Sequence, residues 1–380
     1  MHTFIKNLLN GQAVEWRALG EVANYEQPTK YLVKSKDYDD DFKTPVLTAG
    51  KTFILGYTNE TNGIYQASKN PVIIFDDFTT ANKWVDFDFK AKSSAMKIIS
   101  SVDENQFLLK YIYYWLNTLP SGLVDGDHKR QWISNFANKK IPIPPLSVQS
   151  QIVQILDAFT ELNDQLRDEL TAELSMRQKQ YQYYRDLLLS EHELAKVGFE
   201  WKTLNQISEN LNSMRKPVKG ELRELGNIPY YGASGIVDYV KDYIFDDDLL
   251  LISEDGANLL ARNTPIAFSV SGKCWVNNHA HVLKFKTYEE RRFIEFYLNH
   301  IDLNPYISGA AQPKLNKQNL NSIKIPIPPL SVQSEIVAIL DTFDTLVSSI
   351  SEGLPKEIQL RQKQYEYYRE LLLDFHPNQE

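Results

Sequence analysis

Apolar residues recur at every third or fourth position along two long stretches of the chain. In the first stretch the series is Val148, Ile152, Ile155, Leu156, Phe159, Leu162, Leu166, Leu170 and Leu174. Because an α-helix turns once in 3.6 residues, this spacing puts the apolar side chains on one face of a helix. We therefore predict a central helix over residues 147–193 and a distal helix over residues 331–376. A continuous helix of ~44 residues would be roughly 66 Å long.

The segments before the two predicted helices have a different pattern. Residues 1–146 and 194–330 contain short runs of β-branched and aromatic residues between turns rich in Gly, Asn and Asp. Short runs bounded by turn residues are typical of β-strands. We therefore predict that each segment is a strand-rich α/β domain with few long helices.

The chain repeats itself at an offset of 184 residues. Residues 141–150 recur letter for letter as residues 325–334, and 177–181 recur as 361–365. The domains are related more distantly. Their paired segments are 14–19 with 199–204, 44–50 with 228–235, and 72–77 with 249–254. Self-similarity at one fixed offset indicates a duplicated structural unit, here a domain followed by a helix.

A helix with one apolar face needs a partner, and the second copy of the helix is the candidate. Equivalent elements related by a pseudo-twofold axis run in opposite directions. The predicted fold is therefore an α/β protein with two pseudo-twofold-related domains, joined by two long antiparallel coiled-coil helices. A serine after each Pro-Pro step, Ser147 or Ser331, is expected to cap its helix. Because Pro355 would interrupt a helix, we expect the distal helix to break or kink near 353–355.

Composition limits the protein class. A single cysteine, Cys274, excludes an internal disulfide and a cysteine-built metal site. The first residues lack the apolar run of a signal peptide, and no stretch reaches the length of a membrane span. The sequence therefore predicts a cytoplasmic protein.

The net charge of -8 argues against DNA binding only until its distribution is considered. Segment 147–190 has seven acidic and four basic residues, and segment 331–376 has eight acidic and four basic residues. These segments carry net charges of -3 and -4, which leaves -1 for the rest of the chain. The acidity thus lies on the predicted helices, and the domains can carry local basic clusters.

The repeated sequences are similar to those of one family. The segments 141–150 and 177–181, together with the Ile155-Leu156-Asp157 sequence, resemble the conserved regions of the specificity subunit of type I restriction–modification systems. The resemblance covers essentially the whole chain. Residues 170–174 also resemble a short unit in the central helix of one branch of that family, and the second copy departs from it.

This resemblance implies a non-catalytic subunit that recognises DNA. Its target-recognition domains would be residues 1–146 and 194–330, each reading half of a bipartite double-stranded site, with the helices fixing the gap. Such subunits bind two modification (methyltransferase) subunits, which use S-adenosylmethionine to methylate adenine at N6. Two restriction (endonuclease/translocase) subunits complete the complex and use ATP and magnesium. No cofactor is expected in this chain, and divergence between the domains predicts an asymmetric site.

The chain's own motifs are consistent with a non-catalytic role. The sequence contains neither GxGxxG nor GxxxxGK, the glycine-rich loops that bind nucleotide phosphates. An amino-methyltransferase of the expected type would carry an Asn/Asp-Pro-Pro-aromatic sequence. The nearest string, 75–78, does not match that sequence. We expect the methyl-transfer chemistry to come from a partner.

Two other functions remain open at this point. Asp76 with Asp88-Phe89-Lys90 resembles the acidic and lysine residues of metal-dependent nucleases. The structural interpretation is a turn followed by an alternating strand that exposes Asp88 and Lys90, and the repeat favours it. The other alternative is a coiled-coil scaffold with no role in DNA binding, which would show no sequence preference even with its partners present.

The His279-Ala280-His281 sequence could place two imidazoles on one face of a strand. No third metal ligand is evident, so a structural or DNA-contacting role is favoured. In the first copy we align this sequence with Ser94-Ala95-Met96.

DNA contacts are expected from polar, basic and aromatic residues in the domain loops, because Arg and Lys suit guanine and Asn and Gln suit adenine. The candidates are Lys51, Tyr57, Asn59, Lys83, Lys92, Ser93, Ser234, Arg262, Lys273, Asn277, Asn278, His279 and Lys314. Two tyrosine clusters, Tyr181/Tyr183/Tyr184 and Tyr365/Tyr367/Tyr368, recur identically while the domains differ. We therefore expect the tyrosines to serve helix packing or partner docking rather than base reading.

Overall fold

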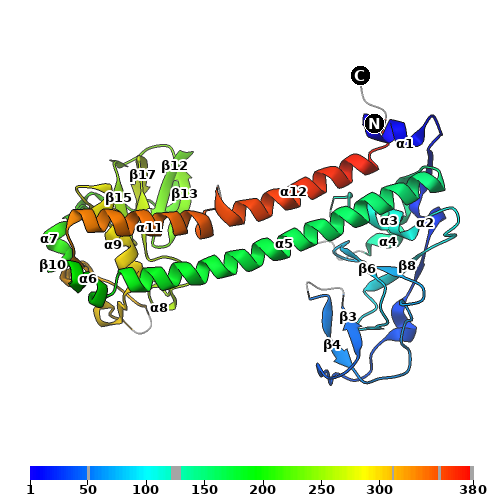
Figure 1. Cartoon of the computed structure of the whole chain (residues 1–380), viewed down its shortest axis with the longest axis horizontal. Helices are drawn as coiled ribbons and strands as arrows, with labels where there is room; N and C mark the ends of the chain where they lie inside the picture. Colours follow the sequence, from blue (N-terminus) through cyan, green and yellow to red (C-terminus); the bar gives the residue numbers. More distant parts are fainter. Residues whose placement is uncertain (49–51, 121–129, 310–311, 350–351, 377–380) are drawn as a thin grey trace. The chain divides into compact units, whose positions relative to one another are not determined.

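The computed structural model describes residues 1–48, 52–120, 130–309, 312–349 and 352–376 (Figure 1). The chain divides into two compact units. Unit 1 comprises Met1–Glu169 and Ile358–Glu380, and unit 2 comprises Leu170–Glu357. Each unit therefore contains one predicted domain together with a part of both repeated helical segments.

Unit 1 is built around a four-stranded sheet in the order β2-β8-β5-β6, a three-stranded sheet in the order β4-β3-β7, and the pair β1-β9. Its elements are α1 (Thr3–Leu9), β1 (Glu15–Ala18), α2 (Leu19–Val22), β2 (Ala23–Glu26), η1 (Pro28–Tyr31), β3 (Thr44–Leu47), β4 (Ile54–Thr58), β5 (Val72–Asp76), β6 (Asn82–Val85), β7 (Lys90–Ala91), β8 (Met96–Ser101), α3 (Leu109–Leu116), α4 (Gln131–Ser134), η2 (Phe136–Asn138) and β9 (Lys140–Ile143).

Unit 2 repeats this plan with sheets β11-β18-β15-β16 and β13-β12-β17-β14 and the pair β10-β19. Its elements are α6 (Glu191–Val197), β10 (Glu200–Thr203), α7 (Leu204–Ile207), β11 (Glu209–Asn210), η3 (Asn212–Met214), η4 (Gly220–Leu222), β12 (Leu225–Gly232), β13 (Gly235–Val240), β14 (Phe245–Asp246), β15 (Leu249–Ser253), α8 (Asn258–Ala261), β16 (Ala267–Val270), β17 (Lys273–Val276), β18 (Ala280–Lys284), α9 (Tyr288–His300), η5 (Asn304–Tyr306), α10 (Lys317–Ser322) and β19 (Lys324–Ile327). The predicted strand-rich α/β class is confirmed for both domains.

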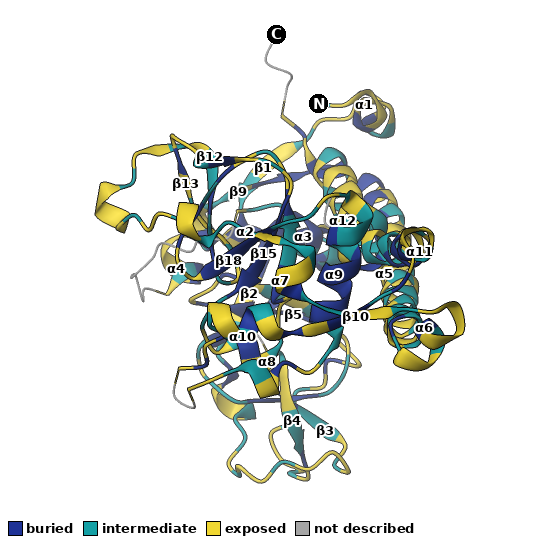
Figure 2. Ribbon diagram, turned by 90° about the vertical axis from the view of Figure 1, so that its left-hand side faces the viewer, coloured by how far each residue is buried: buried dark blue, intermediate teal, exposed yellow. Residues whose placement is uncertain are grey.

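The central strands β5 and β15 are buried along their whole length (Figure 2). In β5, Ile73 and Phe75 face one apolar cluster, whereas Val72 and Ile74 face another. Successive side chains of a strand point to opposite faces of the sheet, so a strand packed on both faces needs an unbroken apolar sequence. The runs Val72–Phe75 and Leu249–Ile252 meet this requirement.

The central helical segment forms one helix, α5 (Leu146–Leu188). The distal segment forms two helices, α11 (Leu330–Ser348) and α12 (Gly353–Leu373). The interruption thus falls before the Gly-Leu-Pro sequence. Pro355 lies in the first turn of α12, where proline is tolerated because the N–H groups there have no intrahelical acceptor.

The predicted serine caps are wrong, because α5 and α11 begin one residue before Ser147 and Ser331. In unit 1 the carbonyl of Pro145 accepts bonds from the N–H groups of Val148 and Gln149. The buried Gln149 side chain donates to the carbonyl oxygens of Pro144 and Gln106 and accepts from the Leu108 N–H. The Pro145 carbonyl therefore accepts from the first turn of the helix, and the buried Gln149 amide ties this turn to Pro144 and to residues 106–108, where a serine hydroxyl was predicted to act.

Within each unit the two helical segments run antiparallel. In unit 1 the Phe159 ring of α5 lies 5.8 Å from the Tyr368 ring of α12, and the Thr160 and Tyr365 hydroxyls are 2.9 Å apart. In unit 2 the Tyr184 ring of α5 stacks 5.5 Å from Phe343 of α11. Because 159 and 184 correspond to 343 and 368 in the repeat, both units make the same contact with the helices exchanged. The detailed coiled-coil packing stays a prediction.

An aspartate of the repeated Ile-Leu-Asp sequence attaches each domain to the helices. In unit 1 the Asp157 carboxylate accepts from the Tyr114 hydroxyl at 2.5 Å and pairs with Lys110 at 3.2 Å, both on α3. In unit 2 the equivalent Asp341 accepts from the Tyr288 hydroxyl at 2.7 Å and from Arg292 Nε at 2.8 Å, both on α9. The same repeated residue thus anchors two different domain helices.

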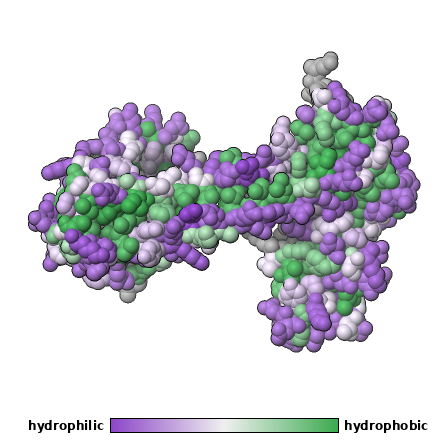
Figure 3. Space-filling view, in the orientation of Figure 1, coloured by the Kyte–Doolittle hydropathy of each residue, from purple (hydrophilic) through white to green (hydrophobic). Residues whose placement is uncertain are grey.

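Apolar side chains also remain at the surface of the helices. In unit 2 they gather over α11, where Leu330 and Ile339 are exposed (Figure 3). Among the helices that the structure describes, none combines the length and the hydropathy needed to cross a membrane.

Candidate DNA-binding surface

Three loops of unit 2 meet at one end of strands β15 and β18. They are the turn 277–279 before β18, the hairpin tip 232–235 between β12 and β13, and Glu254 with Asp255 after β15. The Asn277 N–H donates to the Tyr231 carbonyl at 3.1 Å, and the Glu254 N–H donates to the His279 carbonyl at 2.8 Å. These backbone bonds fix the loops to one another.

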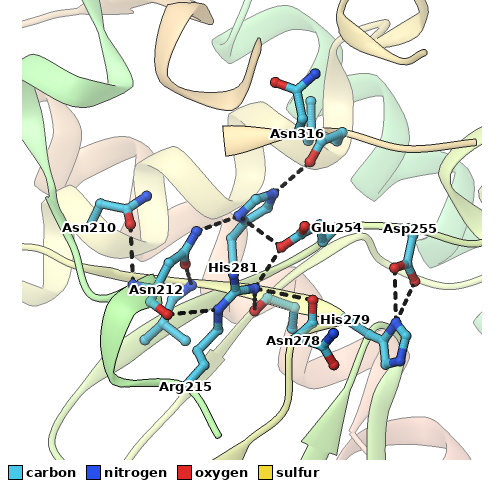
Figure 4. A network of polar contacts seen from close by, with 12 residues as sticks. Asn210, Asn212, Arg215, Glu254, Asp255, Asn278, His279, His281 and Asn316 are labelled. Carbon is cyan, nitrogen blue, oxygen red and sulfur yellow. Dashed lines mark hydrogen bonds and ion pairs between the residues drawn. The ribbon is translucent and has the colours of Figure 1, made fainter. Parts of the chain in front are cut away.

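The Glu254 carboxylate is the centre of a polar network at this place (Figure 4). It accepts from Arg215 Nη1 at 2.6 Å, and Lys314 Nζ lies 3.3 Å away. Burial tends to raise the pKa of Glu254, but the hydrogen bond from Arg215 and the charge of that arginine outweigh it, so the pKa is lowered. Glu254 is therefore an anion that attracts basic side chains to the loops.

The two histidines have separate surroundings. His281 is fully buried, with Nδ1 at 2.8 Å from the Asn212 amide nitrogen and Nε2 at 2.6 Å from the Leu315 carbonyl oxygen. These partners assign the proton to Nε2, because an amide nitrogen donates and a carbonyl oxygen accepts. His279 is exposed, and its Nδ1 lies 2.9 Å from Asp255. No metal-binding group of three or more His, Cys, Asp or Glu residues occurs in the described part of the chain.

Unit 2 is expected to lose stability as the pH falls below 6.5, the ordinary pKa of histidine. Burial lowers the pKa of His281, so in this range the unfolded chain takes up a proton that the folded unit does not. Urea midpoints at about pH 7.5 and about pH 5.5 measure this loss. His281→Gln should reduce the difference between the midpoints, and His300, whose pKa burial also lowers, should account for part of what remains. An unchanged difference in this variant would contradict the assignment.

Unit 1 has the same backbone frame with different side chains. The Lys92 N–H donates to the Leu47 carbonyl at 2.8 Å, and the Asp77 N–H donates to the Ala95 carbonyl at 3.0 Å. Asp77 forms a completely buried ion pair with Lys97, at 3.1 Å. The strand registers equate Asp77 with Glu254 and Lys97 with His281. Each domain therefore holds an acid and a basic side chain at equivalent positions.

This register corrects the alignment of the histidine sequence. Phe75 lies opposite Lys97 in unit 1, as Ile252 lies opposite His281 in unit 2. The counterpart of His279-Ala280-His281 is therefore Ala95-Met96-Lys97, one residue later than predicted. The turn of unit 1 is one residue longer than that of unit 2, which a comparison of letters alone could not show.

Five of the candidates in unit 2 come together at the three loops, and two do not. Those that do are Ser234, Asn277, Asn278, His279 and Lys314. Arg262 instead donates to the carbonyl oxygens of Leu298 and Ile301 at the end of α9. Lys273 starts β17, at the opposite end of that strand from the turn, with its ammonium 4.7 Å from the Tyr243 ring centre.

The candidates in unit 1 are more dispersed. Lys92 and Ser93 lie on the turn before β8, where Lys92 Nζ donates to the Tyr38 hydroxyl at 3.0 Å and Ser93 Oγ accepts from the Ala95 N–H. Tyr57 and Asn59 lie at the base of the β3–β4 hairpin, since Tyr57 is paired with Pro45. The exposed Lys83 lies on β6, and Lys51 falls outside the described residues.

The three side chains of the nuclease alternative lie apart in unit 1. Asp76 caps the turn after β5, accepting from the Phe78 N–H at 2.9 Å and from Thr79 Oγ1 at 2.6 Å. Asp88 accepts from Ser68, which precedes the opposite end of β5, and these bonds lower its pKa. The expectation that Lys90 is exposed is wrong: it is buried and pairs with Glu60 at 3.0 Å.

The tyrosine clusters divide into packed and exposed members. Tyr181 and Tyr184 lie against Phe343, and Tyr365 bonds to Thr160, which agrees with a role in helix packing. Tyr183 and Tyr367 occupy equivalent positions in the repeat and are exposed in both units, by 63% and 60%. Both tyrosines are therefore accessible at equivalent positions, as the predicted role in docking a partner requires.

Sequence reasoning missed the acidic and basic residues that hold the loops, above all Arg215 and Glu254. One signal was available. Glu254 directly follows an apolar strand and aligns with Asp77, so an acid recurs at this position in both copies. Arg215 lies 39 residues before Glu254, and no periodic pattern links them.

Comparisons with known proteins agree with this architecture. The family described as the type I restriction modification DNA specificity domain matches residues 12–175 and 196–360. Over 401 residues the chain is 50% identical to the type I restriction enzyme EcoR124I/EcoR124II specificity subunit of Escherichia coli, and the match covers 98% of this chain and 97% of that protein.

Two solved structures share the fold at 17% sequence identity. One is the S subunit of a type I restriction–modification system from M. genitalium, with a TM-score of 0.57 and coverage of 97% of this chain and 98% of that chain. The other comes from work on the complex assembly and conformational transition of the type I R-M system, with a TM-score of 0.61 and coverage of 96% and 98%.

Each unit therefore contains a DNA specificity domain. The chain belongs to the family of type I restriction–modification specificity subunits, which are non-catalytic and recognise DNA.

Proposed function

We propose that this specificity subunit binds a bipartite, asymmetric double-stranded DNA site, with each domain reading one half. The observation that carries the proposal is the shared backbone frame with different side chains. The turn of unit 1 presents lysine and serine, whereas the turn of unit 2 presents asparagine and histidine. Because base edges differ in their donors and acceptors, different side chains on one frame select different sequences.

The division of the chain follows from this assignment. Residues 1–146 and 194–330 form the recognition domains, residues 147–193 form the central helix, and residues 331–376 form the distal helix. The helical segments fix the distance between the half-sites, as a rigid protein spacer does in dimeric DNA readers. The apolar side chains exposed on α11 give a partner subunit a surface to dock on.

The partners are two modification subunits and two restriction subunits. The modification subunit binds S-adenosylmethionine and methylates adenine, and the restriction subunit uses ATP and magnesium. This chain binds none of these cofactors itself and acts in the cytoplasm. In support, the E. coli relative is named as the specificity subunit of a type I restriction enzyme.

Individual DNA contacts are assigned to the exposed or half-buried members of the two loop sets. In unit 2 these are Ser234, Asn278, His279 and Lys314, and in unit 1 they are Lys92 and Ser93, with Lys51, Tyr57, Asn59 and Lys83 as further candidates. An asparagine amide can bond two atoms of adenine, and lysine suits guanine or phosphate. Asn277, Arg262 and Lys273 are weaker candidates because of their burial or position.

Methylation-motif sequencing tests the proposal. DNA from cells expressing this chain with its modification subunit should carry a split motif with N6-methyladenine in both halves. Exchange of residues 20–140 for the domain of another specificity subunit should change one half only. A palindromic motif would contradict asymmetric reading. An assembled complex that methylates no motif would favour the scaffold alternative.

A further inference from the structure

Arg215 supports the turn 277–279 from inside unit 2. Its Nη1 donates to the Ala280 carbonyl at 2.7 Å and to the Asn278 carbonyl at 3.3 Å, in addition to the Glu254 carboxylate. Its Nε donates to the Asn212 carbonyl at 3.1 Å. The side chain is only 13% exposed. Because its Nε and Nη1 are directed at protein oxygens, Arg215 is placed to hold the turn.

The side chains of the turn divide by direction. Asn277 is buried, and its Oδ1 accepts from the His279 N–H at 2.8 Å, which closes the turn. Asn278 and His279 are exposed at the surface of the three loops. Asp255 lies at hydrogen-bond distance from the His279 ring and fixes its orientation. Two polar side chains are thus presented outward on a turn whose carbonyl oxygens are bound from within.

The support differs in unit 1. There Lys97, which occupies the strand position of His281, pairs with Asp77. The turn is closed by a bond from the Ala95 N–H to Ser93 Oγ at 3.0 Å. The arginine bonds to the turn are therefore a feature of unit 2. A change at Arg215 should act on one half-site and leave the other as an internal reference.

We propose that Arg215 is a positioning residue for base selection by unit 2, which fixes the turn 277–279 so that Asn278 and His279 face the base edges of their half-site. This inference rests on the proposed function. Without the two carbonyl bonds the turn can move, and a displaced amide loses the geometry that separates one base from another. The phosphate contacts that supply general affinity depend on other side chains.

The test compares binding by the assembled complex of the full chain with its modification subunit. Dissociation constants are measured for the duplex carrying the methylated motif and for duplexes with one base pair changed in either half. Arg215→Met should reduce discrimination in the unit 2 half by about 10-fold or more, since a good bidentate base contact contributes about 1–3 kcal/mol. Discrimination in the other half should not change.

Arg215→Lys separates positioning from folding. Lysine keeps a positive charge beside Glu254 but lacks the planar set of donors, so this variant should retain the unfolding midpoint and still lose discrimination. The matched control is Lys284→Met, which breaks the Lys284–Asp247 ion pair at the opposite end of β18. The control should discriminate like the unmodified chain.

Results that refute the positioning role of Arg215 can be told apart from results that refute the proposed function. Unchanged discrimination by Arg215→Met would refute the positioning role, and so would an equal loss in both half-sites. Failure of the proposed function would appear earlier, as an unmodified complex that binds every duplex equally.

Discussion

Replacement of Lys97 by methionine is expected to destabilise unit 1 by about 3–5 kcal/mol. Lys97 and Asp77 have side-chain exposures of 0% and 1%, so the variant would leave the Asp77 carboxylate buried without its cation. Asp77 also accepts from the Trp132 N–H at 2.8 Å, which holds the start of α4. The loss of stability can be measured as a lower urea midpoint of the full chain, with hydrogen exchange to assign it to unit 1.

The double variant Asp77→Asn with Lys97→Met is the control for this prediction. It removes both charges while keeping side chains of similar size, and replacing a whole buried ion pair is often close to neutral. The double variant should therefore recover most of the lost stability. A double variant as unstable as Lys97→Met would mean that the lysine acts through packing and not through its charge.

Replacement of Arg292 by methionine is expected to cost unit 2 about 3–5 kcal/mol, because the arginine neutralises the buried Glu295 together with two partly exposed aspartates. Arg292 is 12% exposed and pairs with Glu295 at 2.5 Å, Asp341 at 2.7 Å and Asp344 at 3.0 Å. Glu295 belongs to α9, whereas the two aspartates belong to α11. Without the guanidinium, three carboxylates face one another and α9 loses its attachment to the helix.

The matched control is Lys110→Met in unit 1. Lys110 pairs with Asp157, the repeat equivalent of Asp341, but the lysine is 31% exposed. Partly exposed pairs contribute only about 0–1 kcal/mol, so this variant should unfold at nearly the unmodified urea concentration. A similar loss in both variants would show that exposure does not decide the strength of this attachment.

The anchoring aspartates explain how different domains can share one helical frame. The repeat supplies Asp157 and Asp341 at equivalent positions, and each domain meets its aspartate with a tyrosine and a basic residue of its own helix. Each domain thus presents two donors to the repeated aspartate from one face of α3 or α9. Domain exchange, on which the proposed experiment depends, should preserve the fold best where the incoming helix presents such donors.

The duplicated plan of the protein can be read from its amino-acid sequence alone. The letter-for-letter repeat, the helical apolar series and the unbroken apolar runs of β5 and β15 are local patterns, and local patterns follow directly from helix and strand periodicity. The family also follows from these letters, because the repeated regions have kept their sequence. The candidate site was predictable only in part, as a set of loops with polar residues.

Which residues act together became visible only in the folded chain. Each unit combines a part of the central helical segment with a part of the distal one. Asp341 bonds to α9, and Arg215 bonds to the backbone of the turn 277–279. All of these contacts join residues that are far apart in the chain. Folding also placed Arg262 at the end of α9 and buried Lys90, two residues that their sequence surroundings suggested would be exposed. Burial and hydrogen-bond partners depend on long-range packing, and no periodicity in the sequence records that packing.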